Sequence, residues 1–307
     1  MFKFINLIIY LLILVLNLMI LLSVAFFTLF ERKVLGYLQL RLGPSKTYFN
    51  GLLQPMADGI KLFLKENSVN MNTNKVLFML FPCFLLLLML MFWLAFIYFS
   101  LNYFCNTMIY IMVISSLGVY GILGSGWSSN SKYSMLGAYR SVAQVVSYEV
   151  GLVFMIMLIF IFAKSYSLGL FTESILFSHM LFFGYLMFFI IWFVVILAEL
   201  NRSPFDFAES ESELVSGFNI EYGSIKFAFL FLSEYGNMIF MCLLSSYLFF
   251  MNSNFIVLML MFLLIWVRGS FPRYRYDNLM YLNWKMYLPV ILLLFLIIYL
   301  VDMLIFL

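Results

Sequence analysis

Eight apolar runs follow one another along this chain of 307 residues, with polar segments between them. Each run has roughly the length, about 17–25 residues, that an α-helix needs to cross a lipid bilayer. The runs lack the regular alternation of apolar and polar residues that marks membrane β-strands. We therefore predict an all-α, polytopic membrane helical bundle that forms a single transmembrane domain over residues 1–307. The eight predicted transmembrane helices lie near residues 4–30, 77–99, 107–126, 141–163, 180–200, 227–250, 253–269 and 286–306.

The longest polar segment, between the first two runs, contains a different pattern. Apolar residues recur there at the spacing of an amphipathic helix, at Leu52, Leu53, Met56, Ile60 and Phe63. Three charged residues lie off this stripe, at Asp58, Lys61 and Lys65. The pattern predicts an amphipathic interfacial helix near residues 51–65, lying along the membrane surface. Packing of the same stripe against the inner end of the bundle explains the pattern equally well.

Composition supports a membrane protein and excludes several kinds of site. Hydrophobic residues make up 65% of the chain and charged residues only 10%, against about 45–50% and 25% in soluble domains. The cysteines, Cys83, Cys105 and Cys242, have no CxxC spacing, and His179 is the only histidine. This chain alone therefore supplies no ligand set for zinc, haem or an iron–sulfur cluster. Redox chemistry would have to be housed in other subunits.

The positions of the basic residues predict an orientation. The polar segments after the first, third, fifth and seventh runs contain all but two of the 17 Lys and Arg residues. The exceptions are Lys3 and Lys164. By the positive-inside rule, these four segments face the cytoplasm, or the matrix of a mitochondrion, and both termini face the other side. Extreme use of Phe, Met and Leu with little Ala indicates an AT-rich genome and favours an organelle.

A short acidic segment follows the fifth run. Besides Glu199, it contains Asp206, Glu209, Glu211, Glu213 and Glu221. If residues 204–215 form a helix that begins at Pro204, three of these carboxylates share one face. Cations from elsewhere must then neutralise that face, or some of its carboxyl groups must be protonated. An exposed acidic loop that binds nothing is the alternative, but the apolar residues between the charges make full exposure unfavourable.

Two further carboxyl groups, Glu149 and Glu234, lie inside predicted transmembrane helices. A lipid-facing carboxylate costs at least about 2.5 kcal/mol, so each must face protein or a water-filled cavity. Neither has a basic residue within one helical turn. With Glu199, they are candidates for a proton relay. The alternative is a structural role in which they hold helices together or dock a neighbouring subunit, and Glu199 has a simple partner in Arg202 at i+3.

Four long motifs complete the picture: ERKVLGYLQLRLGPSK (31–46), GWSSNSKYSMLGAYRSVAQVVSYEV (126–150), AELNRSPFDFAESESELVSGFNIEY (198–222) and WVRGSFPRYRYDNLMYLNWK (266–285). In these motifs and in their order, the chain resembles the mitochondrially encoded subunit 1 family of NADH:ubiquinone oxidoreductase, respiratory complex I. The likeness covers about residues 20–290.

The resemblance implies a core membrane subunit of a proton-pumping enzyme in the mitochondrial inner membrane, catalytic only within the complex. It implies no cofactor bound by this chain, ubiquinone as substrate, and FMN and iron–sulfur clusters in partner subunits. The expected partners are the peripheral subunits around the quinone site, the adjacent membrane-arm subunits and membrane lipids. Nucleic acid is not an expected partner.

The resemblance also implies roles for individual residues. Part of the ubiquinone tunnel, its chamber and the acidic loop are expected to involve Arg32, Asp206, Glu209, Glu211, Glu213, Glu221, Phe231 and Arg275. The proton path is expected to involve Glu149, Glu199, Glu234, Lys132 and Arg140. One departure from the family pattern is Ser210, which stands where glycine is expected and gives less access to positive φ.

Three other interpretations stay open at this point. A proton-coupled transporter would need a substrate site near the middle of the membrane, commonly with broken helices. The fourth to sixth runs contain no proline and only the isolated Gly151, Gly184 and Gly236. A membrane subunit of an energy-converting hydrogenase fits the motifs but not the organelle-like composition. A purely structural anchor would need its acidic loop for assembly and not for turnover.

Overall fold

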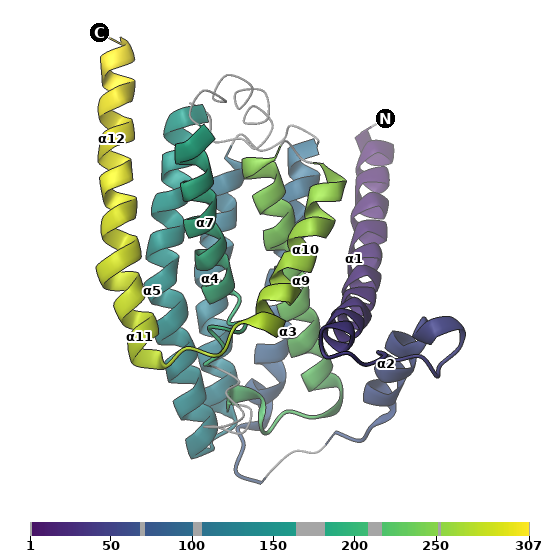
Figure 1. Ribbon diagram of the computed structural model, residues 1–307. Coiled ribbons are helices and arrows are strands. Elements are labelled where there is room, and N and C mark those ends of the chain that lie inside the picture. Colours follow the sequence, from purple (N-terminus) through teal and green to yellow (C-terminus); the bar gives the residue numbers. More distant parts are fainter. Residues whose placement is uncertain are drawn as a thin grey trace.

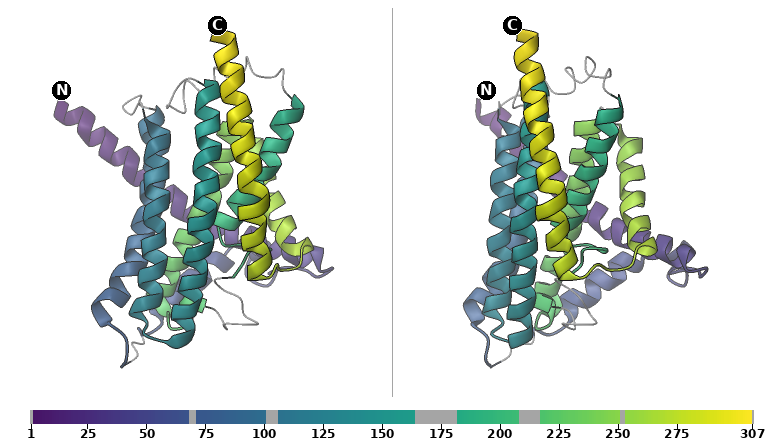
Figure 2. Two further views of the ribbon diagram at one scale, coloured as in Figure 1. Left: turned by 90° about the vertical axis from the view of Figure 1, so that its left-hand side faces the viewer. Right: turned by 60° about the vertical axis from the view of Figure 1, so that its left-hand side comes forward.

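The computed structural model describes residues 2–67, 71–100, 106–163, 182–207, 217–250 and 253–306. All regular structure in these ranges is helical. The long helices are α1 (Phe2–Leu38), α3 (Lys75–Ser100), α4 (Thr107–Ser128), α5 (Lys132–Ala163), α7 (Phe182–Glu199), α9 (Ser224–Phe249), α10 (Asn254–Ser270) and α12 (Leu288–Phe306). They form one bundle with both termini at the same end (Figure 1). Helix α1 is steeply tilted against the others (Figure 2).

Within the described residues, six helical stretches are long and apolar enough to cross a membrane. They are Leu11–Leu38, Lys75–Phe96, Thr107–Ser128, Lys132–Ile159, Ser224–Phe249 and Tyr276–Ile297. Two shorter apolar stretches, Phe188–Glu199 and Asn254–Ser270, coincide with the fifth and seventh predicted runs. The prediction of an all-helical membrane bundle is therefore confirmed.

Several helices extend beyond the apolar runs that predicted them. Helix α5 begins at Lys132, well before the predicted start at residue 141. The added part, residues 132–140, contains Lys132, Ser134 and Arg140 and is too polar to be detected as an apolar run, but Ser134 and Ala138 within it are buried. Helical backbone ahead of α12 likewise begins at Tyr276, with α11 (Tyr276–Tyr281) and a π-helical turn, η5 (Leu282–Tyr287). Hydropathy alone detects the apolar part of such helices and misses their polar ends.

Helix α2 (Gln54–Leu64) lies outside the main bundle, next to α1 and α9 (Figure 1). It follows a short 3₁₀ turn, η1 (Phe49–Gly51), in which Gly51 has a φ of +81°. A Cβ atom at Gly51 would lie 2.2 Å from the carbonyl oxygen of Pro44, so only glycine fits this turn. The predicted apolar stripe of this segment is solvent-accessible, with Met56 42% and Ile60 60% exposed.

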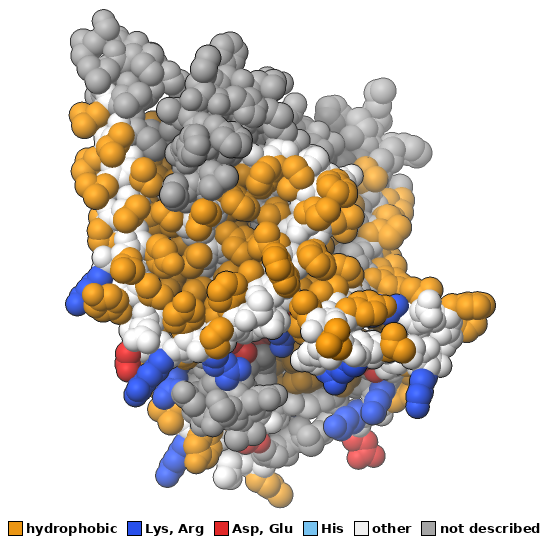
Figure 3. All heavy atoms as spheres, in the orientation of Figure 1, with side chains coloured by type: hydrophobic (Ala, Val, Ile, Leu, Met, Phe, Trp, Pro, Cys, Tyr) orange, Lys and Arg blue, Asp and Glu red, His pale blue; other side chains and the backbone are white. Residues whose placement is uncertain are grey.

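The core lies between α3, α4, α5, α7, α9 and α10. Its fully buried side chains include Trp192 of α7, Phe240 of α9 and Tyr148 of α5. The outer surface is also apolar: hydrophobic side chains cover the middle of the visible face (Figure 3). Most Lys and Arg side chains on that face lie beyond this belt, at the end of the bundle near α2 (Figure 3). An apolar belt of this size fits burial in lipid.

Buried amide groups fix α5 to its neighbours. Gln144 donates hydrogen bonds of 2.8 Å to the carbonyl oxygens of Ala198 and Phe205. Asn283, which is fully buried in η5, donates a 2.6 Å hydrogen bond to the carbonyl oxygen of Ser147. The acceptor carbonyls belong to the last turn of α7, to the segment that follows α7, and to α5. These bonds hold the segment that follows α7 in a defined position.

Candidate functional site

A polar cavity of about 100 Å³ lies inside the bundle. Because a water molecule occupies about 30 Å³ in the liquid, this volume has room for a few waters. Its polar lining consists of Ser115, Glu199, Asn201, Arg202, Ser233, Glu234 and Asn237. The apolar lining comes from α3, α4, α5, α9 and the 3₁₀ turn η4 (Gly217–Asn219), and includes Phe92, Val145, Phe218 and Phe240.

Two of the three predicted relay carboxyl groups line this cavity. Glu199 is the last residue of α7, and its Oε2 atom is buried without a hydrogen-bond partner among the described residues. Glu234 comes from α9, and its side chain is 27% exposed. Glu149 is half-buried on α5 and does not line the cavity. The structure thus brings Glu199 and Glu234 together in one cavity, while Glu149 lies on α5, which packs against α7.

Arg202 is the cation of the cavity. Its Nη2 atom lies 4.0 Å from Oε2 of Glu234, and its Nη1 atom lies 4.0 Å from Oε1 of Glu31 on α1. The guanidinium carbon is 4.5 Å from the centre of the Tyr235 ring, which is a cation–π distance. Sequence spacing suggested Glu199 as the partner of Arg202, whereas these ion pairs connect it to α1 and α9.

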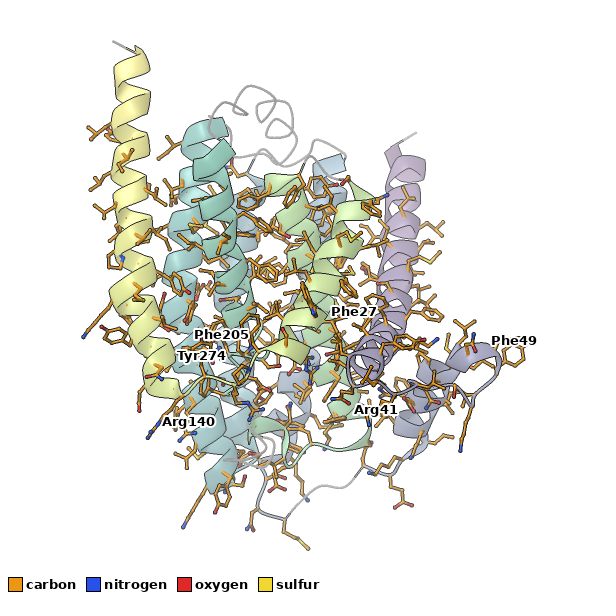
Figure 4. The ribbon with its side chains drawn as sticks, in the orientation of Figure 1. Phe27, Arg41, Phe49, Arg140, Phe205 and Tyr274 are labelled. Carbon is orange, nitrogen blue, oxygen red and sulfur yellow. The ribbon has the colours of Figure 1, made fainter. Side chains whose placement is uncertain are left out.

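Glu31 is a functional candidate that sequence reasoning missed, although it begins the first of the four long motifs. Its carboxylate accepts a 2.6 Å hydrogen bond from the Tyr235 phenol and pairs with Arg268 of α10. The spacing of apolar residues along α1 could have indicated that Glu31 is buried. Glu31 continues the buried face of α1 that contains Val24 and Phe27, at spacings of seven and four residues. Phe27 is labelled in Figure 4.

The start of the acidic segment is docked onto the chain between α10 and α11. Phe205 stacks on Tyr274 with ring centres 5.6 Å apart (Figure 4), and the backbone N–H of Tyr274 donates to the carbonyl oxygen of Pro204 at 3.0 Å. Asp206 forms an ion pair with Arg273 at 3.5 Å. Arg275, which the family resemblance assigned to the chamber, pairs with Asp277 on the surface.

The predicted helix does not begin at Pro204. Residues 204–207 form a turn followed by non-helical chain, because this part is held by the ring contact and hydrogen bond described above. Glu209, Glu211 and Glu213, together with Ser210, lie outside the described residues. Glu221 is described, and it is half-buried in the turn just before α9.

The remaining predicted site residues lie nearer the basic end. Arg32 donates a 2.7 Å hydrogen bond to Asp58 of α2, and both side chains are substantially exposed. Lys132 is exposed at the start of α5, and Arg140 is half-buried further along the same helix (Figure 4). Phe231 stacks on Tyr235 with ring centres 6.1 Å apart. Through Tyr235, Phe231 is therefore close to the carboxylate of Glu31. Lys132 is far from the relay carboxyl group of its own helix, because it lies 17 residues from Glu149 on α5, about 25 Å along the helix axis.

Comparisons with known proteins show the family of this chain. A sequence model of the family described as NADH dehydrogenase matches residues 11–299. A tick protein, from Rhipicephalus sanguineus, is 49% identical over 280 residues, covering 90% of this chain and 89% of its own length. A squid protein, from Heterololigo bleekeri, is 47% identical, covering 89% and 90%. A lamprey protein, from Lampetra fluviatilis, is 46% identical, covering 92% of both.

All three relatives are named NADH-ubiquinone oxidoreductase chain 1. The family match and the alignments with these relatives each cover nearly the whole chain. The chain therefore belongs to the NADH dehydrogenase family.

Proposed function

We propose that this chain is the first membrane subunit of a proton-pumping NADH:ubiquinone oxidoreductase and couples quinone reduction to proton movement. The observation that carries the proposal is the polar cavity with Glu199, Glu234 and Arg202 inside an otherwise apolar bundle. Carboxyl groups at such positions are costly, and in membrane proteins they commonly serve ion or proton pathways. The names of the relatives supply the reaction, since each is a chain of an NADH-ubiquinone oxidoreductase.

The proposal includes a defined arrangement in the mitochondrial inner membrane. Helices α7 and α10 join the six longer candidates to give eight transmembrane spans in one domain. The basic end of the bundle faces the matrix, and both termini face the intermembrane space. Helix α2 lies along the matrix surface of the membrane, which gives its exposed apolar residues a lipid environment.

Ubiquinone is the proposed substrate, and this chain forms part of its access tunnel and chamber. Arg32, Phe231 and Arg275 belong to the proposed tunnel and chamber, with Asp206 and Glu221 at the acidic loop. Glu209, Glu211 and Glu213 complete that loop. Two contacts support this step: Asp206 pairs with Arg273, and Phe231 stacks on Tyr235, whose phenol donates to the carboxylate of Glu31.

The proposed mechanism is electrostatic. Quinone reduction changes the charge near Asp206, and in surroundings of low dielectric constant such a change acts strongly on nearby carboxyl groups. A proton then moves between the loop and Glu199, Glu149 and Glu234, with Lys132 and Arg140 setting the local potential. Because the coupling is thermodynamic, protonation of this path must also change the affinity for quinone.

The remaining chemistry is proposed to belong to partner subunits. FMN and iron–sulfur clusters there carry electrons from NADH, while this chain binds no cofactor of its own. Peripheral subunits around the quinone site and adjacent membrane-arm subunits are the proposed protein partners, and lipids cover the apolar belt.

The test uses the assembled enzyme in sealed membrane vesicles. Glu199→Gln and Glu149→Gln are expected to lower the number of protons pumped per NADH oxidised, because glutamine cannot take up a proton. Glu66→Gln is the matched control, since Glu66 is exposed at the end of the α2 segment. An unchanged pumping ratio in both relay variants would contradict the relay.

A further inference from the structure

The side chain of Arg202 lies between two cavities. The second cavity is small, about 20 Å³, and contains Glu31 and Arg268 in its wall. Among the described residues, Leu200 and Arg202 line both this cavity and the larger one that contains Glu199 and Glu234. Arg202 is therefore the charged group that separates the two. Its side chain is only 12% exposed.

Two carboxylates of the described residues lie at equal distance from the Arg202 guanidinium. The closest N–O distance is 4.0 Å on each side, to Glu31 and to Glu234. Tight charge-assisted hydrogen bonds have distances of about 2.7–2.9 Å, so neither carboxylate holds the guanidinium firmly. The Tyr235 ring supports it from one face at 4.5 Å. A guanidinium in this position is attracted by both sides at once.

The charges of the cluster make the two sides interdependent. The ion pairs join the carboxylates of Glu31 and Glu234 to the cations of Arg202 and Arg268, and Glu199 lines the same cavity as Arg202. Protonation of Glu234 removes one negative charge beside Arg202 and shifts the balance of attraction on the guanidinium towards Glu31. Loss of charge at Glu31 has the opposite effect and strengthens the attraction between Arg202 and Glu234. In a half-buried site these effects are weakly screened.

We propose that Arg202 is a shared cation that couples the charge of Glu31 to the charge of Glu234. Glu31 is then a second group whose charge acts on the acidic path, in addition to the loop after α7. It lies on α1 and pairs with Arg268 of α10. Arg202 is a positioning residue in this scheme, and Tyr235 holds it by contacting both Glu31 and the guanidinium. The inference rests on the proposed proton relay, of which Glu234 is a member.

The alternative is a static ion cluster that only ties α1, α9 and α10 to the turn after α7. Both interpretations predict that removal of Arg202 damages the enzyme. They differ in whether the effects of changes at Glu31 and Glu234 depend on each other through Arg202. A mutant cycle measures that dependence directly.

The experiment uses the assembled enzyme with Glu31→Gln, Glu234→Gln and the double variant. Each is made with Arg202 present and again with Arg202→Met, which keeps the length of the side chain and removes its charge. With Arg202 present, the effects of the two glutamine variants on the rate of proton pumping are expected to be non-additive by about fivefold. With methionine they are expected to be additive, and Arg202→Lys should restore part of the coupling.

A spectroscopic measurement separates this inference from the relay itself. The carboxyl C=O band of Glu234 is identified in infrared difference spectra by its loss in Glu234→Gln. Glu31→Gln is expected to shift this band when Arg202 is present and to leave it unchanged with Arg202→Met. Such a shift supports the shared cation even if Glu234→Gln pumps normally, an outcome that would remove Glu234 from the relay.

Two results would overturn the inference. One is additivity in the Arg202 background, together with a Glu234 band that does not respond to Glu31→Gln. The other is equal coupling with arginine and methionine, which would mean that another route connects the two carboxyl groups. If the methionine variant does not assemble, Tyr235→Phe replaces it, since this change keeps every charge and removes the bond to Glu31. The coupling must then be smaller than in the parent enzyme.

Discussion

The phenol of Tyr235 on α9 donates a 2.6 Å hydrogen bond to the carboxylate of Glu31 on α1, across 204 positions of sequence. Both side chains are buried, with exposed fractions of 7% and 5%. A hydrogen bond to a charged acceptor is stronger than one between neutral groups. This contact is therefore an important link between the tilted first helix and the rest of the bundle.

Tyr235→Phe is expected to weaken this link. The loss of a hydrogen bond to a charged group costs about 1.5–3 kcal/mol, and the buried Glu31 carboxylate would keep Arg268 as its main partner. We expect a lower midpoint of thermal unfolding for the purified complex, measured by intrinsic fluorescence. Tyr120→Phe, at a residue 65% exposed on α4, is the control. Equal midpoints for the two variants would argue against a structural role for the Tyr235 hydroxyl.

Gln144→Leu is expected to loosen the segment that carries Glu199 and Arg202. The Gln144 amide donates to two buried carbonyl oxygens, those of Ala198 and Phe205. Leucine has a similar volume but makes neither bond, so the two carbonyls would keep only the backbone N–H donors of Asn201 and Phe207. Each lost hydrogen bond costs about 0.5–1.5 kcal/mol. Hydrogen–deuterium exchange of amides 198–207 should become faster, while Gln39→Leu, in the exposed turn after α1, should leave it unchanged. Unaltered protection of this segment in Gln144→Leu would show that the Gln144 amide does not hold it in place.

The sequence was sufficient to predict helices but not their partners. Each apolar run became a helix because its length and composition leave few alternatives in lipid. Glu234 was singled out as a charge inside an apolar run, and its ion-pair partner, Arg202, belongs to another part of the chain. The same holds for Glu31, whose partners Tyr235 and Arg268 are on α9 and α10. Such pairs depend on how helices tilt and pack, which local patterns do not contain.

Tyr222 provides a test at alkaline pH. This residue lies in the turn before α9, where burial raises the pKa of its phenol from 10.0 to about 12, and the hydrogen bond with Ser128 lowers that pKa by a smaller amount. Between these values the unfolded chain loses the proton and the folded chain keeps it, so stability falls as pH rises. The full effect is about 3 kcal/mol.

Tyr222→Phe removes this titration. The parent protein is expected to lose more stability than the variant when the pH is raised from about 9 to about 11, measured as the shift in unfolding midpoint. At the lower pH the variant should be the less stable one, because it lacks the bond to the carbonyl oxygen of Ser125. Parallel losses in the two proteins would mean that Tyr222 does not control the alkaline transition.

Gly137→Ala tests a close backbone contact between α5 and η4. A Cβ atom at Gly137 of α5 would lie 2.8 Å from the Cα atom of Gly217 in η4, where no flexible side chain can move aside. Alanine should push η4 away from α5 and displace Phe218, which lines the polar cavity. We expect reduced assembly into the complex on native gels and, in whatever assembles, a lower pumping ratio.

Gly59→Ala is the matched control for that change. Gly59 lies within α2, and a Cβ atom there would meet nothing within 4 Å. Since alanine favours an exposed helix over glycine by about 0.5–1 kcal/mol, this variant should assemble at least as well as the parent. The same loss of assembly in both variants would show that the effect at Gly137 does not come from the contact between α5 and η4. Normal assembly and pumping of Gly137→Ala would show that this contact is not needed to position the cavity wall.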